Sequence, residues 1–171
     1  VLAFVGGQQQ AFVAVNAPRQ PNQGVMADAA SRAKWVRVPR PGRWEGFRAA
    51  EYELGQHQIR MPRTPGVGEK FPGWLLMGFQ VFRRLEEAGY VVVPGEGASR
   101  QVLEVYPHAA YTVLLERVPF PKHALEGRLQ RQLVLYDHKV EVPDPMRIFE
   151  EITRHRLLQG VLPLENLFSA E

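Results

Sequence analysis

The alternation of short β-rich runs with segments of helical periodicity constrains the fold of this chain more than any other feature. Strands are predicted over residues 11–16 (AFVAVN), 90–93 and 101–106 (QVLEVY). The clearest helical spacing of apolar side chains covers residues 73–88, and Gly89 is typical of a helix end. Strands that alternate with helices predict an α/β fold with a short sheet flanked by helices.

Further helices are predicted over residues 46–58, 108–115, 122–136 and between Asp144 and Gly160. The last begins with an aspartate and a proline, a pair typical of a helix start, and Met146 is expected to face inward. Residues 19–46 carry Pro, Gly, Asn and Arg without a sustained period, which predicts a long irregular loop.

Composition excludes several classes of protein. The 171 residues contain no cysteine, so zinc ribbons, Fe–S clusters and thiol nucleophiles are excluded. No apolar run approaches the roughly 20 residues of a membrane helix. The first ten residues also lack the pattern of a signal peptide. We therefore expect a single cytoplasmic domain over residues 1–171 that does not contact a membrane.

Both ends of the sequence look truncated. The chain begins at Val1 with an apolar run, and Ser169, Ala170 and Glu171 are typical of a helix start with no helix behind it. We expect a piece of a longer chain, and engineered ends or disordered tails remain alternatives.

The net charge of +3 is unevenly distributed. Residues 19–66 hold nine basic and four acidic side chains, whereas residues 67–171 hold twelve and fourteen. Trp35 and Trp44 lie among the basic residues of the segment 31–48, which include Arg37, Arg43 and Arg48. Guanidinium groups pair with phosphates and indoles stack on bases, so these residues are candidates for binding single-stranded nucleic acid. The alternative is a solvated loop that its tryptophans pack down.

Two polar residues mark strand ends. Asn16 ends the first strand, where open α/β sheets place their sites, although an asparagine before Ala17-Pro18 is equally typical of a turn. Glu104 interrupts an apolar strand, so its carboxylate must be paired, bound to metal or exposed. Lys122, Arg128 and Arg131 are candidates for phosphate binding near a helix start, with surface ion pairing as the alternative.

Four segments together resemble the DUF429 family, predicted nucleases of the ribonuclease H-like superfamily. The segments are FVAVNAPRQPNQG, RAAEYEL with Arg48 and Glu51, LEVYPHAAY with Glu104, and KHALEGRLQRQL with Lys122, Gly127 and Arg131. They follow the family's order over residues 11–135.

The resemblance implies a ribonuclease H-like mixed sheet and an acidic site for Mg²⁺ or Mn²⁺ at the strand ends. Glu51 and Glu104 would be the metal ligands, and Lys122 or Arg131 would stabilise developing charge. Asn16 stands where the family usually has aspartate, and a neutral amide is a weaker ligand for magnesium.

Two functions therefore follow from the sequence. One is a metal-dependent nuclease acting on nucleic acid, with Asn16, Glu51, Glu104 and Lys122 as catalytic residues. The other is a non-catalytic relative that binds nucleic acid, a nucleotide or a protein partner. The oligomeric state is left open, with a homodimer among the alternatives.

Overall fold

The structure is a computed structural model that describes residues 2–35, 38, 40, 42 and 44–160. It divides into two compact units, Val1–Tyr106 and Pro107–Glu171, which are described separately. The expected helix start at 169–171 and two loop arginines, Arg37 and Arg43, lie outside the described residues.

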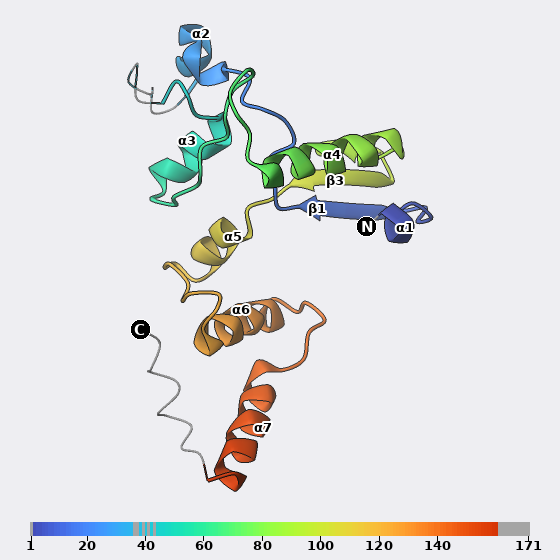
Figure 1. Cartoon of the computed structure of the whole chain (residues 1–171), viewed down its shortest axis with the longest axis vertical. Coiled ribbons are helices and arrows are strands. Elements are labelled where there is room, and N and C mark those ends of the chain that lie inside the picture. Colours follow the sequence, from blue (N-terminus) through green and yellow to red (C-terminus); the bar gives the residue numbers. More distant parts are fainter. Residues whose placement is uncertain (1, 36–37, 39, 41, 43, 161–171) are drawn as a thin grey trace. The chain divides into compact units, whose positions relative to one another are not determined.

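The first unit is built around three parallel strands (Figure 1). Its elements are α1 (Leu2–Val5), β1 (Ala11–Val15), η1 (Val25–Ala27), α2 (Ala29–Arg32), α3 (Ala49–Gln56), α4 (Gly73–Glu87), β2 (Val91–Val92) and β3 (Arg100–Glu104). The strand order is β1-β3-β2, and both pairings are parallel. An α/β fold is thus confirmed. The antiparallel pairing of the expected mixed sheet is not present among the described strands.

The core of this unit lies between α4 and one face of the sheet. Phe82 and Leu85 of α4 pack with Tyr90 and with Val102 of β3, and all four are buried. Along β1 the odd-numbered residues face this core, whereas Phe12 is 66% exposed on the other face. One face of β1 is therefore covered by α4, and its other face is exposed within this unit, as the alternation of side chains along a strand requires.

Residues 19–46 are more structured than predicted. Asp28 caps α2 by accepting a hydrogen bond from the Ser31 amide at 2.7 Å. The hydrogen bond from the Ser31 side chain, followed by that from the Ser31 amide, lowers the pKa of Asp28. Asn22 is 7% exposed, and its side-chain NH₂ group donates a hydrogen bond to the carbonyl of Gly46 at the far end of this segment. The prediction of an irregular loop was wrong for η1 and α2, because helices of three or four residues are too short to show a sequence period.

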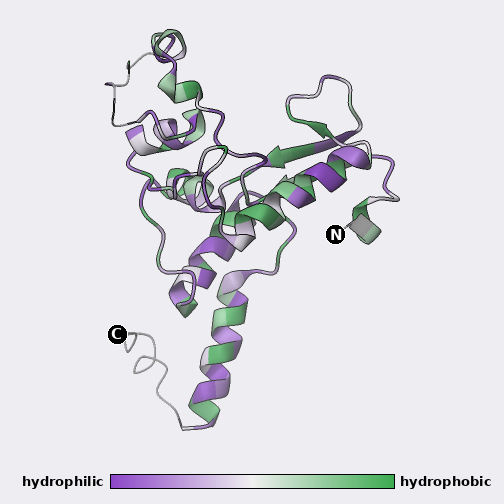
Figure 2. Ribbon diagram, turned by 45° about the horizontal axis from the view of Figure 1, so that its top comes forward, coloured by the Kyte–Doolittle hydropathy of each residue, from purple (hydrophilic) through white to green (hydrophobic). Residues whose placement is uncertain are grey.

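The second unit contains α5 (Pro107–Leu114), α6 (Leu125–Asp137) and α7 (Pro145–Leu158). Asp144 caps α7 through the Met146 amide, which confirms the predicted start. The inward orientation expected for Met146 was wrong, because its side chain is 57% exposed. It lines a hollow of about 1140 Å³ along α7, together with Phe149 and Leu157, and no predicted site residue lines this hollow. Figure 2 shows hydrophobic and hydrophilic turns alternating along this helix.

Candidate functional site at the strand ends

The carboxyl ends of β1 and β3 lie side by side and point toward the segment that carries α3 (Figure 1). Val15 and Glu104 are register partners, and the Val105 amide donates to the Val15 carbonyl at 3.0 Å just beyond them. Asn16 follows Val15 directly. The structure thus brings Asn16 and Glu104 to one edge of the sheet, as parallel pairing requires.

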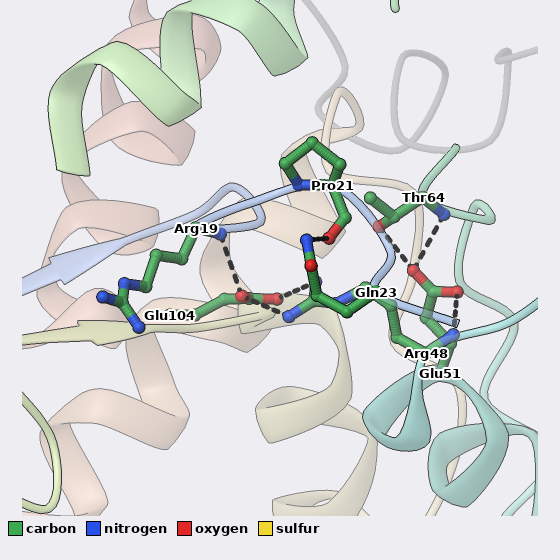
Figure 3. A network of polar contacts seen from close by, with 7 residues as sticks. All are labelled: Arg19, Pro21, Gln23, Arg48, Glu51, Thr64 and Glu104. Atoms are coloured by element: carbon green, nitrogen blue, oxygen red, sulfur yellow. Dashed lines mark hydrogen bonds and ion pairs between the residues drawn. The ribbon is translucent and has the colours of Figure 1, made fainter. Parts of the chain in front are cut away.

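Glu104 is held by a bidentate ion pair with Arg48 (Figure 3). The two terminal guanidinium nitrogens donate to Oε1 and Oε2, each at 2.6 Å. The Arg19 backbone amide also donates to Oε2, at 3.1 Å. The side chains of Arg48 and Glu104 are 20% and 23% exposed, so the pair is partly desolvated. The sequence left Glu104 as paired, bound to metal or exposed, and the structure shows it paired.

Glu51 is 3% exposed and accepts three hydrogen bonds. Its Oε2 accepts from the Arg48 backbone amide at 3.0 Å, which closes the first turn of α3. Its Oε1 accepts from the Thr64 amide at 2.8 Å and from the Thr64 hydroxyl at 2.5 Å. A buried carboxylate with three donors is satisfied, and it fixes residue 64 against α3.

Arg48 connects these two carboxylates. Its backbone amide binds Glu51 and its guanidinium binds Glu104, 56 residues away along the chain. The N-cap position gives Arg48 an extended backbone, with φ of −78° and ψ of 157°. The start of α3 therefore positions the arginine at the end of β3.

Arg19 forms a second ion pair beside the first. Its guanidinium donates to the carboxylate of Glu86 on α4, at 2.7 and 3.3 Å. The hydrogen bond to Glu86 raises the pKa of Arg19 above its ordinary value. The segment after β1 is thus tied to both α4 and Glu104.

The hydrogen bonds of Glu51 and Glu104 occupy part of the oxygen lone pairs that a divalent cation would need. Metal ligation requires accessible lone pairs on the carboxylate oxygens. All four oxygens of Glu51 and Glu104 accept hydrogen bonds from Arg19, Arg48 or Thr64. Within the described ranges, no group of three or more His, Asp or Glu side chains is placed to hold a metal. The assignment of both glutamates as metal ligands stays a prediction.

Asn16 lies outside this network. It is exposed, and among the described contacts its side chain makes no hydrogen bond, including none to its own turn. The amide is therefore available at the sheet edge, and its role as a catalytic residue stays a prediction.

The tryptophans of the basic loop pack on α3. Trp35 and Trp44 are half-buried and meet the Tyr52 ring edge-on, with centroids 5.6 and 5.2 Å away. Trp44 also contacts Phe47 at 4.9 Å. A Cβ atom on Gly55 would approach the Trp44 ring to 2.9 Å, so the absence of a side chain at position 55 makes room for the indole. This is the packing that the alternative interpretation of the loop predicted.

A cavity of about 580 Å³ lies beside this aromatic cluster. Trp44 and Phe47 line it together with Gln58 and Arg60. Its volume falls within the range of roughly 300–1,000 Å³ that is typical of small-molecule sites. Trp44 thus has both a packing contact and a surface toward a cavity.

The basic side chains of the loop divide into two groups. Arg32 is 8% exposed and donates to the carbonyls of Met26 and Ala27, so its role is structural. Lys34 and Arg40 are exposed.

The remaining candidates lie in the second unit. Lys122 is exposed and precedes α6, which begins three residues later than predicted. Arg128 is exposed on α6. Arg131 donates to the carbonyls of Phe120 and Gly127, at 2.8 and 2.7 Å, and therefore holds the loop before α6. The roles of these three residues in phosphate binding stay predictions.

Sequence reasoning missed Arg19 and Thr64. Neither lies in a periodic segment, and both donate to a glutamate through a backbone amide, which residue type does not reveal. Thr64 donates through its hydroxyl as well.

These features define a small parallel α/β unit with an arginine–glutamate network at the carboxyl ends of its strands, followed by a helical unit. Residues 9–160 match the sequence profile of the family described as "Protein of unknown function (DUF429)", and the chain belongs to this family. Comparison with curated proteins and with solved structures gives no match. No described helix is long and apolar enough to cross a membrane.

Proposed function

We propose that this protein is a non-catalytic member of its family that binds single-stranded nucleic acid through the first unit. The observation that carries the proposal is the cavity of about 580 Å³ lined by Trp44 and Arg60 within the basic part of the chain. An indole offers a stacking surface to a base, and a guanidinium beside it can bind the adjoining phosphate.

The charge distribution supports the same surface. Lys34, Arg40 and Arg60 are exposed, and none forms an ion pair with a described carboxylate. Each cation that neutralises a phosphate releases counterions, so binding should weaken steeply as salt rises.

Fluorescence anisotropy with labelled 12-nucleotide RNA and DNA tests the proposal across a salt series. The Arg60→Ala variant should weaken binding and reduce the slope of log affinity against log salt by about 1. Trp44→Leu should weaken binding through loss of stacking, with folding verified by circular dichroism. Arg83→Ala is the matched control, because Arg83 is an exposed cation on α4, away from the cavity lining. Absent binding, or equal binding by all variants, would contradict the proposal.

Metal-dependent phosphodiester hydrolysis is a second candidate, favoured by the position of Asn16 beside Glu104 at the sheet edge. Mg²⁺ or Mn²⁺ would have to bind after Arg48 releases Glu104. Incubation of the full chain with RNA and DNA in Mn²⁺, beside a Glu104→Gln variant, tests this candidate. Cleavage that the variant abolishes would favour hydrolysis over the non-catalytic role.

A further inference from the structure

We infer that Arg48 takes the place of a divalent cation at the strand ends, so that the acidic site of this chain is neutralised by its own guanidinium. The inference concerns Glu104 and its partners, and it does not depend on nucleic-acid binding. The carboxylate of Glu104, expected to ligate metal, contacts hydrogen-bond donors of Arg48 and Arg19.

The first step is the occupancy of Glu104. A carboxylate offers about four lone-pair sites. Arg48 takes one on each oxygen at 2.6 Å, and the Arg19 amide takes a third at 3.1 Å. One site is left, on Oε1, and a metal ion that used it would lie beside the Arg48 guanidinium that already binds this oxygen.

The positive charge of Arg48 opposes the entry of a second cation at Glu104. The guanidinium lies at hydrogen-bonding distance from both oxygens, so an entering Mg²⁺ or Mn²⁺ would meet a fixed positive charge at the same carboxylate. Partial burial of both side chains weakens the screening of that repulsion. The planar fork of arginine matches the carboxylate geometry, which makes the pair difficult to displace.

The third step is the position of Arg48 within the fold. Glu51 binds the backbone amide of the same residue and is itself fixed by Thr64. The arginine is therefore held at its main chain as well as at its side chain, and its guanidinium is preorganised toward Glu104.

Manganese binding, measured by the electron paramagnetic resonance signal of free Mn²⁺, tests the inference. The wild-type chain should show no binding that depends on Glu104 at millimolar Mn²⁺. Arg48→Met keeps an unbranched apolar side chain but removes the guanidinium and its charge, and it should raise Mn²⁺ affinity at least tenfold. The double variant Arg48→Met/Glu104→Gln should lose this gain.

Two results would overturn the inference. One is Mn²⁺ binding by the wild type that Glu104→Gln removes. The other is a folded Arg48→Met variant with no gain in affinity. Should Arg48→Met fail to fold, NMR of the wild type decides, because Mn²⁺ bound at this site would selectively broaden the amides of Val15, Arg19 and Glu104. Selective broadening refutes the inference, and its absence at millimolar Mn²⁺ supports it.

Discussion

Gly78 of α4 lies so close to Ala17 that a Cβ atom at position 78 would approach the Ala17 Cβ to 2.5 Å. Ala17 belongs to the segment that leads from β1 to Arg19. The close approach of helix and segment therefore helps to place the Arg19 amide that binds Glu104.

The Gly78→Ala variant should be less stable than the wild type. In most helix interiors this substitution stabilises by about 1 kcal/mol, because glycine is the poorer helix former. Here overpacking should outweigh that gain and cost about 1–3 kcal/mol. Urea denaturation measures the change. Gly73→Ala in the same helix is the control, since a Cβ there meets nothing within 4 Å. Equal effects of both variants would contradict the packing described.

Gly127 should be the least replaceable glycine of the second unit. A Cβ at this position would lie 2.0 Å from the Pro121 carbonyl oxygen, and a backbone atom cannot move aside as a side-chain tip can. Gly127→Ala should displace the loop that Arg131 holds and weaken the start of α6. Amide exchange of residues 125–131 should accelerate relative to wild type. Gly7→Ala, whose Cβ meets nothing within 4 Å, should leave this exchange unchanged.

Glu51 and Thr64 should show coupled contributions to stability. Glu51→Gln leaves a buried amide facing hydrogen-bond donors, at a cost of about 1–3 kcal/mol. Thr64→Val removes the hydroxyl that donates to Glu51. In a double-mutant cycle the two changes should be non-additive by about 0.5–3 kcal/mol. Glu53→Gln on the same helix is the control, and additive free energies of unfolding for Glu51 and Thr64 would refute the network.

Glu69, which pairs with Arg63, should have a pKa below the ordinary value of a glutamate. The hydrogen bond from Arg63, followed by that from the Gly66 amide, lowers the pKa of Glu69. A lowered pKa in the folded state means that the stabilisation is present above the pKa of the unfolded chain and is lost as pH falls through the folded value. Both side chains are exposed, so the effect on global stability should be small. Carboxyl-carbon NMR of Glu69 should show the low pKa, and Arg63→Gln should raise it. An unchanged pKa in that variant would disprove the contact.

Local sequence patterns predict the secondary structure well over residues 11–16, 73–88 and 144–160. Their apolar periods, capping residues and terminal glycines act within a few residues, so the corresponding β1, α4 and α7 are found close to the predicted bounds. The same reasoning missed α2, which is too short for a period. It also misplaced Met146, because a helical stripe does not reveal which side a neighbouring helix covers.

The candidate site was predicted as a set of residues but not as a set of contacts. Residue type and the family's motifs indicate Arg48, Glu51 and Glu104, and Arg48 contacts both glutamates in the structure. Their partners could not be predicted, because Arg48 and Glu104 are separated by 56 residues and Arg19 and Thr64 act through main-chain amides.

The sequence by itself determined the α/β class, the family, the freedom from cysteine chemistry and the position of polar residues at the ends of the strands. Those properties depend on composition and on patterns within a few residues. Only the tertiary structure decided which partner the Glu104 carboxylate has. The pairing of Glu104 depends on which donors the folded chain brings within hydrogen-bonding distance, and here it brings Arg48 to Glu104 at 2.6 Å.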